Sequence, residues 1–269
     1  MSKETPGESL NPRVVGWLQK LNRAKSDSAR ERAVGGIVRA SYPGMPGQLE
    51  QYYAKRPEKS VDFLLILARL IEKGDAEALP PLGRFLGDER AAARNNATRI
   101  VTNHRLAEHF IPELEKLTRD QDEMGPFLET IRALEASPSP ETQRVLTELW
   151  KRGVKGDFRR GHVLRALAHY GDPALRPTLE TIFADEREHP YTRRMAAYGL
   201  ARLGDVDKAR LLRTELDSKD EGAWRAAAEA LFHLTGRERD FSPAGRNRLR
   251  KWWDDNLASV KRRIEGFRR

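Results

Sequence analysis

The chain has 269 residues, of which 33% are charged and 7% aromatic, with a formal net charge of +9 and no cysteine. This composition is common in exposed helical proteins. The aromatic content is lower than expected for a protein rich in buried strands. The lack of cysteine excludes disulfides, thiolate metal sites and a cysteine nucleophile, and it fits a reducing, cytoplasmic location. The longest apolar run, from Phe63 to Ala68, is far too short to cross a bilayer, and the first residues lack a signal-peptide core.

Positive charge is concentrated at the two ends of the sequence. Residues 1–56 carry 10 Lys or Arg against 5 Asp or Glu, and residues 237–269 carry 11 against 5. Residues 57–236 carry 28 against 30 and are slightly acidic. Because each phosphate contact needs a cation, the basic ends make nucleic acid an alternative partner, whereas the acidic body disfavours a groove that follows a duplex.

In chain order, regular breaks divide the sequence into helix pairs. A Gly-Asp dipeptide follows an apolar helix end at Gly74, Gly171 and Gly204, where glycine permits the left-handed turn and aspartate caps the next helix. A Ser-Pro stretch at Ser137 has the same role, and the last three breaks lie 34 and 33 residues apart. We predict seven pairs, at 11–41, 44–73, 75–103, 105–136, 138–170, 172–203 and 205–235, and a closing helix from about Ser242.

The second helices of the later pairs carry a recurrent pattern, an arginine followed by an alanine-rich stretch and a large apolar residue. It occurs in "RNNATRIV", "RRMAAYGLARLGD" and "WRAAAEALFHLTG". The pattern resembles HEAT repeats of the short bacterial type first noted in phycobilin lyases, clearly over 75–236 and weakly over 1–73. The resemblance implies a fold used by binding scaffolds, adaptors and occasional enzymes.

These observations predict one all-α fold, a right-handed α-solenoid of about seven stacked antiparallel helix pairs with a C-terminal capping helix. No single pair has enough apolar surface to fold alone, so stacked neighbours must supply the core. We expect irregular helix pairs of the same solenoid over 1–73, HEAT-like repeats over 74–236, and a basic capping helix and tail over 237–269.

A row of arginines stands at the start of the second helices, each preceded by an acidic residue. The pairs are Arg94 with Asp88, Arg194 with Glu188, and Arg225 with Asp220. Such a row could bind phosphates, but the resemblance implies an Asp-Arg ladder that locks neighbouring turns, and an arginine held between carboxylates gains bidentate hydrogen bonds. We therefore favour a structural role. The fifth pair departs from the pattern, with Gly161 at the matching position.

The opposite stripe of the second helices supplies our candidate binding residues. If Ala197, Leu200 and Leu203 face the core, helical spacing turns the other stripe away from it. That stripe contains Tyr191, Met195, Tyr198 and Arg202, and repeats as Phe158, His162, Arg165 and His169 and as Glu229 and His233. Because second helices usually line the concave side of HEAT-like arrays, we predict a protein-binding wall; the alternative is ordinary solvated residues. Its predicted contacts are His162, Arg165, His169, Tyr198 and Arg202.

We predict no metal, cofactor or catalytic residue. His169 and His233 lie two repeats apart, and His162 and His169 about 10 Å apart along one helix, too far to share an ion. The His-Glu dipeptide pairs of the di-iron HEAT enzyme deoxyhypusine hydroxylase are absent. A HEAT-like DNA glycosylase is a further alternative, with Trp150 and Trp224 as walls and Glu229 as the carboxylate.

The basic tail combines two tryptophans with many cations. We expect Trp252 or Trp253 to plug the open end of the solenoid, and the cations of "KRRIEGFRR", from Lys261 onward, to be freer. The function we predict is a non-enzymatic scaffold that binds a protein partner through its concave surface. The alternatives are nucleic-acid binding through the basic ends and the glycosylase activity.

Overall fold

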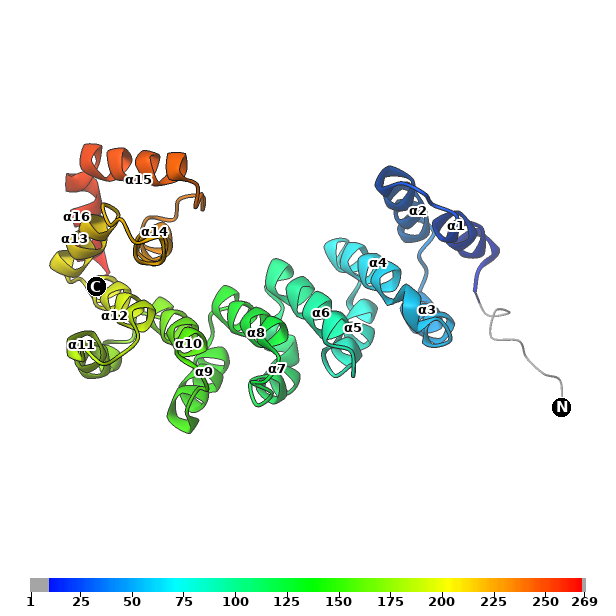
Figure 1. Cartoon of the computed structure of the whole chain (residues 1–269). Helices are drawn as coiled ribbons and strands as arrows, with labels where there is room; N and C mark the ends of the chain where they lie inside the picture. Colours follow the sequence, from blue (N-terminus) through cyan, green and yellow to red (C-terminus); the bar gives the residue numbers. More distant parts are fainter. Residues whose placement is uncertain (1–9, 268–269) are drawn as a thin grey trace. The chain divides into compact units, whose positions relative to one another are not determined.

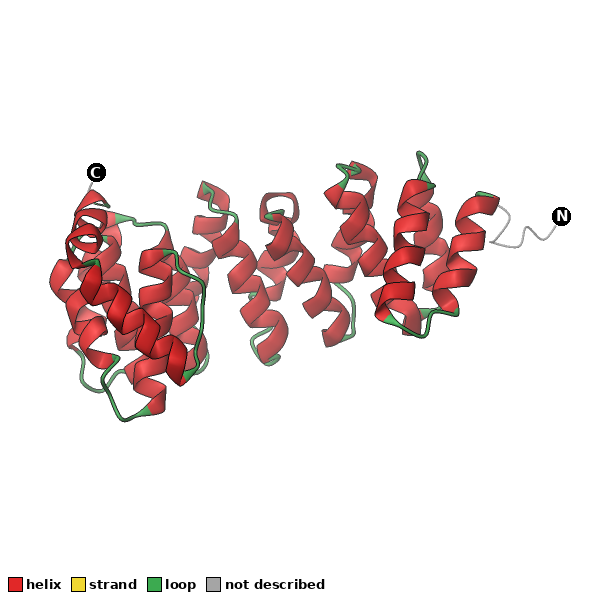
Figure 2. Cartoon of the chain, turned by 90° about the horizontal axis from the view of Figure 1, so that it is seen from above, coloured by secondary structure: helices red, strands yellow, loops and turns green. Residues whose placement is uncertain are grey.

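The computed structural model describes residues 10–267, and within that range every regular element is a helix (Figure 2). The chain divides into two compact units, 1–137 and 138–269. Of the described helices, none is both long enough and apolar enough to cross a membrane. Because all the described regular elements are helices, the prediction of an all-α fold is confirmed.

The first unit contains four helix pairs, drawn from blue to green in Figure 1. They are α1 (Pro12–Asn22) with α2 (Asp27–Arg39), α3 (Met45–Ala54) with α4 (Ser60–Glu72), α5 (Leu79–Leu86) with α6 (Ala91–His104), and α7 (Ile111–Leu117) with α8 (Met124–Ala136). Short 3-10 turns, η1 (Pro57–Lys59), η2 (Ala76–Ala78) and η3 (Ala107–Phe110), connect them. The second helices α2, α4, α6 and α8 contact one another in that order, which is solenoid stacking.

The second unit contains three helix pairs and two closing helices. The pairs are α9 (Pro140–Arg152) with α10 (Asp157–His169), α11 (Arg176–Ala184) with α12 (Pro190–Arg202), and α13 (Val206–Glu215) with α14 (Glu221–Thr235). The 3-10 turn η4 (Pro173–Leu175) precedes α11, and α15 (Pro243–Asp255) and α16 (Leu257–Gly266) follow the pairs. All seven predicted pairs are thus confirmed, whereas the predicted single closing helix is two helices.

The Gly-Asp breaks have the predicted geometry. Gly74, Gly171 and Gly204 have φ values of +82°, +67° and +90°, in the left-handed region that glycine adopts without a steric penalty. The aspartate after each glycine accepts a hydrogen bond from a backbone N–H at the start of the next helical turn, with N–O distances of 2.9 to 3.0 Å. For these local reasons only three residues separate the end of one helix from the start of the next helical element.

The arginine ladder exists with different partners from those predicted. Arg94 donates to the backbone carbonyls of Asp88 and Glu89 at 2.8 and 2.9 Å, and its carboxylate partner Glu123 belongs to the following repeat. Arg194 pairs with Glu215 at 2.5 Å instead of Glu188. Arg94 and Arg194 therefore join their repeats to the following ones, and the predicted pairing with the preceding carboxylates was wrong for both.

Arg225 also departs from the predicted pairing. It bonds Glu221 at 2.8 Å, one turn along its own helix, rather than Asp220. Asp220 is occupied in capping α14, where its side chain accepts from two backbone N–H groups. A carboxylate used as a helix cap is not oriented toward a side chain that lies further along the same helix.

The closing helices complete the core of the second unit. Trp253 is buried beside Leu249 on α15, and Val260 and Ile264 of α16 join the same apolar cluster. Trp252 is half-buried beneath the guanidinium of Arg237, 4.6 Å from its ring centroid. The expectation that a tail tryptophan covers the end of the repeat stack is met by Trp253.

Candidate protein-binding site

The predicted binding residues meet in one network that crosses three second helices, α10, α12 and α14. We call this network the polar seam. It consists of His162, Arg165, His169, Tyr191, Tyr198, Arg202, Glu229 and His233. The contact between the Tyr198 and His233 rings, with centroids 5.9 Å apart, joins its two ends. Because α12 contacts both α10 and α14, equivalent faces of the three helices bring these side chains together. The sequence register of the stripe was therefore correct.

Arg165 is the central residue of the polar seam. Its side chain is 1% exposed, and it reaches from α10 to α14, where Nη1 lies 2.6 Å from Nε2 of His233. Its Nε lies 3.7 Å from Glu229, one turn earlier on α14. A guanidinium has only donors, so Nε2 of His233 must be the unprotonated, accepting nitrogen. Burial first, and then the positive charge of Arg165, lower the pKa of His233 to about 2.

The seam continues from Glu229 to the beginning of α10. The Tyr191 hydroxyl donates to Glu229 at 3.2 Å and lies 3.3 Å from both ring nitrogens of His162. Phe158 packs against this pair, edge-on to His162 with ring centroids 4.5 Å apart and tilted relative to Tyr191 with centroids 5.1 Å apart. This end of the seam is thus a cluster of three rings held in place by a charged hydrogen-bond network.

At the other end the seam reaches the ends of α10 and α12. The Tyr198 hydroxyl lies 3.5 Å from Nδ1 of His169, and Arg202 donates to the His169 backbone carbonyl at 2.7 Å. That contact supplies a donor to a carbonyl that the end of α10 leaves without an intrahelical partner. The guanidinium of Arg202 also lies 4.4 Å from the ring centroid of Phe267, which follows α16.

The helices that carry the seam match a known repeat family over residues 157–232. These residues are HEAT repeats. The chain is also similar, at low sequence identity and low TM-score, to solved structures. One is the complex of CpcE and CpcF of phycocyanin lyase from Nostoc sp. PCC7120, at 17% identity and a TM-score of 0.43, covering 94% of this chain and 99% of that chain. Another is human deoxyhypusine hydroxylase in complex with glycerol, at 16% identity and a TM-score of 0.31, covering 83% and 96%. No curated protein matches the chain.

The exposure expected for the stripe was wrong. Within the HEAT repeats, His162, Arg165 and Tyr198 are buried, at 6%, 1% and 0% exposure, while His169 and Arg202 are half-buried. The cause is the position of α12, which contacts α10, α11, α13 and α14 and so has no solvent-facing stripe along most of its length. The buried members of the seam therefore position other side chains and do not form a surface by themselves.

Gly161 explains why the fifth pair lacks an arginine at the ladder position. A Cβ atom there would lie 2.3 Å from the ring of Tyr191, closer than any side chain tolerates. Glycine therefore lets the Tyr191 ring pack directly on the backbone of α10, from which its hydroxyl reaches His162 and Glu229. The departure from the repeat pattern belongs to the polar seam.

Phe158 is the exposed member of this constellation. Its side chain is 46% exposed although its ring rests on His162 and Tyr191. A single exposed apolar side chain is common on protein surfaces, but a ring that is already fixed in place loses little entropy when a partner covers it. The sequence placed Phe158 on the stripe, but helical spacing alone could not show that it is the ring left open.

The arrangement expected of a DNA glycosylase does not form around Glu229. Trp224 is 5% exposed, and its ring is covered by Arg225 and by Arg246 of α15. Glu229 of the same helix contacts Arg165 and Tyr191 instead. Trp150, the other predicted wall, is half-buried with Arg160 5.1 Å from its ring centroid. The charged groups in contact with the two tryptophan rings are thus arginines and not Glu229. Over residues 10–267, no group of three or more His, Asp or Glu side chains is placed to hold a metal ion.

The cations of the tail are less free than expected. Arg250 pairs with Asp217 at 2.7 Å, and Lys261 lies 3.8 Å from Glu265. Arg246 and Arg263 donate to the backbone carbonyls of Ser218 and Thr235 at 3.3 and 3.0 Å. The contacts of Arg246, Arg250 and Arg263 dock α15 and α16 on the residues around α14, whereas the Lys261 pair lies within α16. Residues 268–269, the end of the predicted free stretch, lie outside the described residues.

Proposed function

We propose that this protein is a non-enzymatic HEAT-repeat scaffold that binds a protein partner over the polar seam, with Phe158 as the anchoring contact. The observation that carries the proposal is the half-exposed Phe158 ring, fixed on two buried rings that belong to a charged network. Aromatic residues dominate the energetics of protein interfaces, and an anchor held in its bound position binds at a lower entropic cost.

The second proposed contact is Arg202, at the other end of the seam. Its guanidinium is held by the His169 carbonyl and the Phe267 ring, while its Nε has no hydrogen-bond partner among the described residues. That nitrogen is buried, so a partner's carboxylate would pair instead with the other guanidinium nitrogens of this half-buried side chain, because guanidinium and carboxylate groups match in geometry and charge. His169, which is also half-buried, accompanies it.

The charge of the second unit supports an acidic partner surface. Residues 138–269 carry 28 Lys or Arg against 20 Asp or Glu, whereas residues 1–137 carry 21 against 20. Nearly all of the positive excess therefore lies in the unit that contains the polar seam. Complementary charge raises the association rate and selects among partners more than it increases affinity, so the apolar anchor remains necessary.

In this proposal the buried predicted residues act indirectly. His162 supports the Phe158 ring, Arg165 holds Glu229 and His233 together, and Tyr198 links His169 to the middle of the seam. Replacing one of them would affect binding by releasing the residues it supports. Replacing Phe158 would remove a contact without disturbing the core.

The test is capture of partners from the source cells by the tagged full-length protein and by three variants. Phe158→Ala and Arg202→Ala remove the proposed contacts. Leu211→Ala is the matched control, because Leu211 is 40% exposed and lies on the first helix α13. Loss of an anchor costs about 2 kcal/mol or more, which is roughly a thirtyfold loss of affinity. We expect Phe158→Ala to lose a protein that Leu211→Ala retains. Equal capture by all variants would contradict the proposal.

A further inference from the structure

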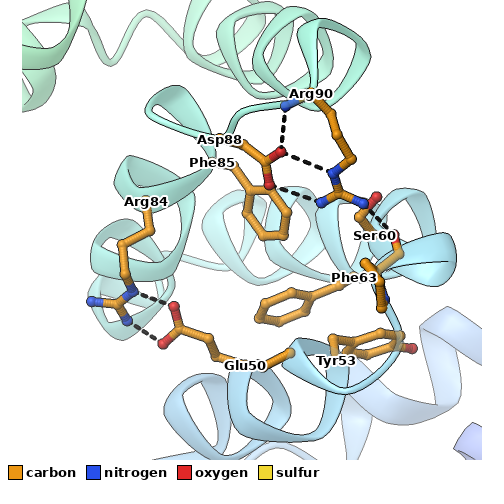
Figure 3. Close-up of a pocket in the computed structure, with 10 residues that line it drawn as sticks. Glu50, Tyr53, Ser60, Phe63, Arg84, Phe85, Asp88 and Arg90 are labelled. Atoms are coloured by element: carbon orange, nitrogen blue, oxygen red, sulfur yellow. Dashed lines mark hydrogen bonds and ion pairs between the residues drawn. The ribbon is translucent and has the colours of Figure 1, made fainter.

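A pocket of about 250 Å³ lies in the first unit, at adjacent turns of the second and third helix pairs (Figure 3). Its lining comes from the end of α3, the start of α4, the end of α5 and the turn that precedes α6. None of these elements carries the polar seam. The pocket is therefore a separate candidate, and nothing in the proposed function accounts for it.

The floor of the pocket is aromatic. Tyr53 and Phe63 are 4% and 1% exposed and stack with centroids 5.0 Å apart and an interplanar angle of 9°. Phe85 meets Phe63 edge-on at 5.8 Å and 66°, and it is half-buried. Burial raises the pKa of Tyr53, so this ring remains neutral at physiological pH. The part of the Phe85 ring that remains accessible is suited to contact with another ring.

Two arginine-carboxylate pairs stand on either side of this floor, and Figure 3 shows Phe63 and Phe85 between them. Arg84 binds Glu50 through two nitrogens, and Arg90 binds Asp88 with N–O distances of 2.9 and 2.8 Å. The Arg90 hydrogen bonds lower the pKa of Asp88. Each guanidinium is already matched by a carboxylate, so the rim is neutral as a whole. A charged ligand would have to break a bidentate pair to form its own.

We propose that this pocket binds one aromatic side chain, Phe, Tyr or Trp, presented by a protein partner. The volume lies below the roughly 300 to 1,000 Å³ of sites that enclose a drug-sized ligand, so it favours a single side chain over a molecule of that size. The paired rim decides against an acidic or basic side chain. An apolar pocket with a satisfied polar rim is the arrangement that surrounds interface anchors.

The test uses single-residue probes and the full-length protein. N-acetyl-tryptophanamide, N-acetyl-tyrosinamide, N-acetyl-leucinamide and N-acetyl-argininamide are titrated while the backbone amide NMR signals of Tyr53, Ser60 and Phe85 are followed. We expect saturable shifts with the two aromatic probes at millimolar concentration, and binding of the other two that is about tenfold weaker.

Two variants and a control complete the experiment. Phe85→Ala removes a wall, and Ala54→Tyr fills the pocket from an exposed position without touching the core. Phe183→Ala is the control, because Phe183 is also half-buried and lies in the second unit. The first two should weaken binding of N-acetyl-tryptophanamide at least about tenfold, and the control should leave it unchanged. Aromatic probes that give no saturable shift, or that bind Ala54→Tyr as well as the wild type, would overturn the inference. Neither result would bear on Phe158, which is tested by other variants.

Discussion

Acidification is expected to destabilise this protein through His233, and the substitution His233→Gln should remove that part of the loss. Nε2 of His233 lies 2.6 Å from Nη1 of Arg165, so protonation would place a second positive charge and a second donor against the guanidinium. Glutamine keeps an accepting carbonyl for Arg165 and does not titrate.

The magnitude follows from the two pKa values. Burial and Arg165 lower the pKa of His233 in the folded state from 6.5 to about 2. Between these values the unfolded chain binds a proton that the folded chain does not, so stability falls as the pH falls. The slope is about 1.4 kcal/mol per pH unit, and at pH 5 the loss from this residue amounts to about 2 kcal/mol.

The assay is urea denaturation of the wild type and His233→Gln at pH 8 and pH 5. Other carboxylates and histidines contribute to both proteins and cancel when the two losses are compared. The wild type should lose about 2 kcal/mol more than the variant between the two pH values. Parallel losses in the two proteins would show that burial and Arg165 do not hold His233 neutral, and the polar seam as described would be wrong.

Two further predictions concern stability, and two concern binding. Gly161→Ala should lower the free energy of unfolding by about 2 kcal/mol in denaturation experiments, because its Cβ would overlap the Tyr191 ring. Gly16→Ala in α1 should be neutral or slightly stabilising, because its Cβ would meet no atom within 4 Å outside the backbone of its own helix. Arg94→Ala should lower the free energy of unfolding by about 2 kcal/mol, because it removes the donors to two backbone carbonyls and to Glu123. The control Arg99→Ala, at an exposed position, should lower it by less than about 0.5 kcal/mol. Similar losses for both variants would refute the structural role of the Arg94 contacts. Phe158→Ala should lose a captured protein that Leu211→Ala retains, and Ala54→Tyr should weaken binding of N-acetyl-tryptophanamide.

The helix pairs were predictable because their boundaries depend on local chemistry. A glycine with positive φ and an aspartate that caps the next helix act within a few residues, as Gly204 and Asp205 show. The ladder partners were not predictable in the same way. Arg94 finds its carboxylate in the next repeat, and sequence distance gives no means of choosing between the preceding turn and the following one.

The members of the polar seam were predictable, but their burial was missed. Periodicity aligned Arg165, Tyr198 and His233 on one stripe, and the structure brings their helices together. A signal for burial was present in the stretch Met195–Ala201, which carries no charged residue and so indicates a helix covered on all sides. The aromatic pocket had no such signal, because four short segments contribute to it.

The central claim, that a protein partner binds over the polar seam at Phe158, can be tested by site-specific cross-linking. The chain has no cysteine, so a single cysteine introduced at Lys155, an exposed position near Phe158, can carry a photoactivatable maleimide. A cysteine at Lys219, which is also exposed, serves as the control. We expect the cysteine at position 155 to form a discrete protein adduct in the source cells. The adduct should disappear when Phe158→Ala is introduced into the same chain, and it should not form from position 219. The same adducts from both positions, or adducts indifferent to Phe158→Ala, would contradict the central claim.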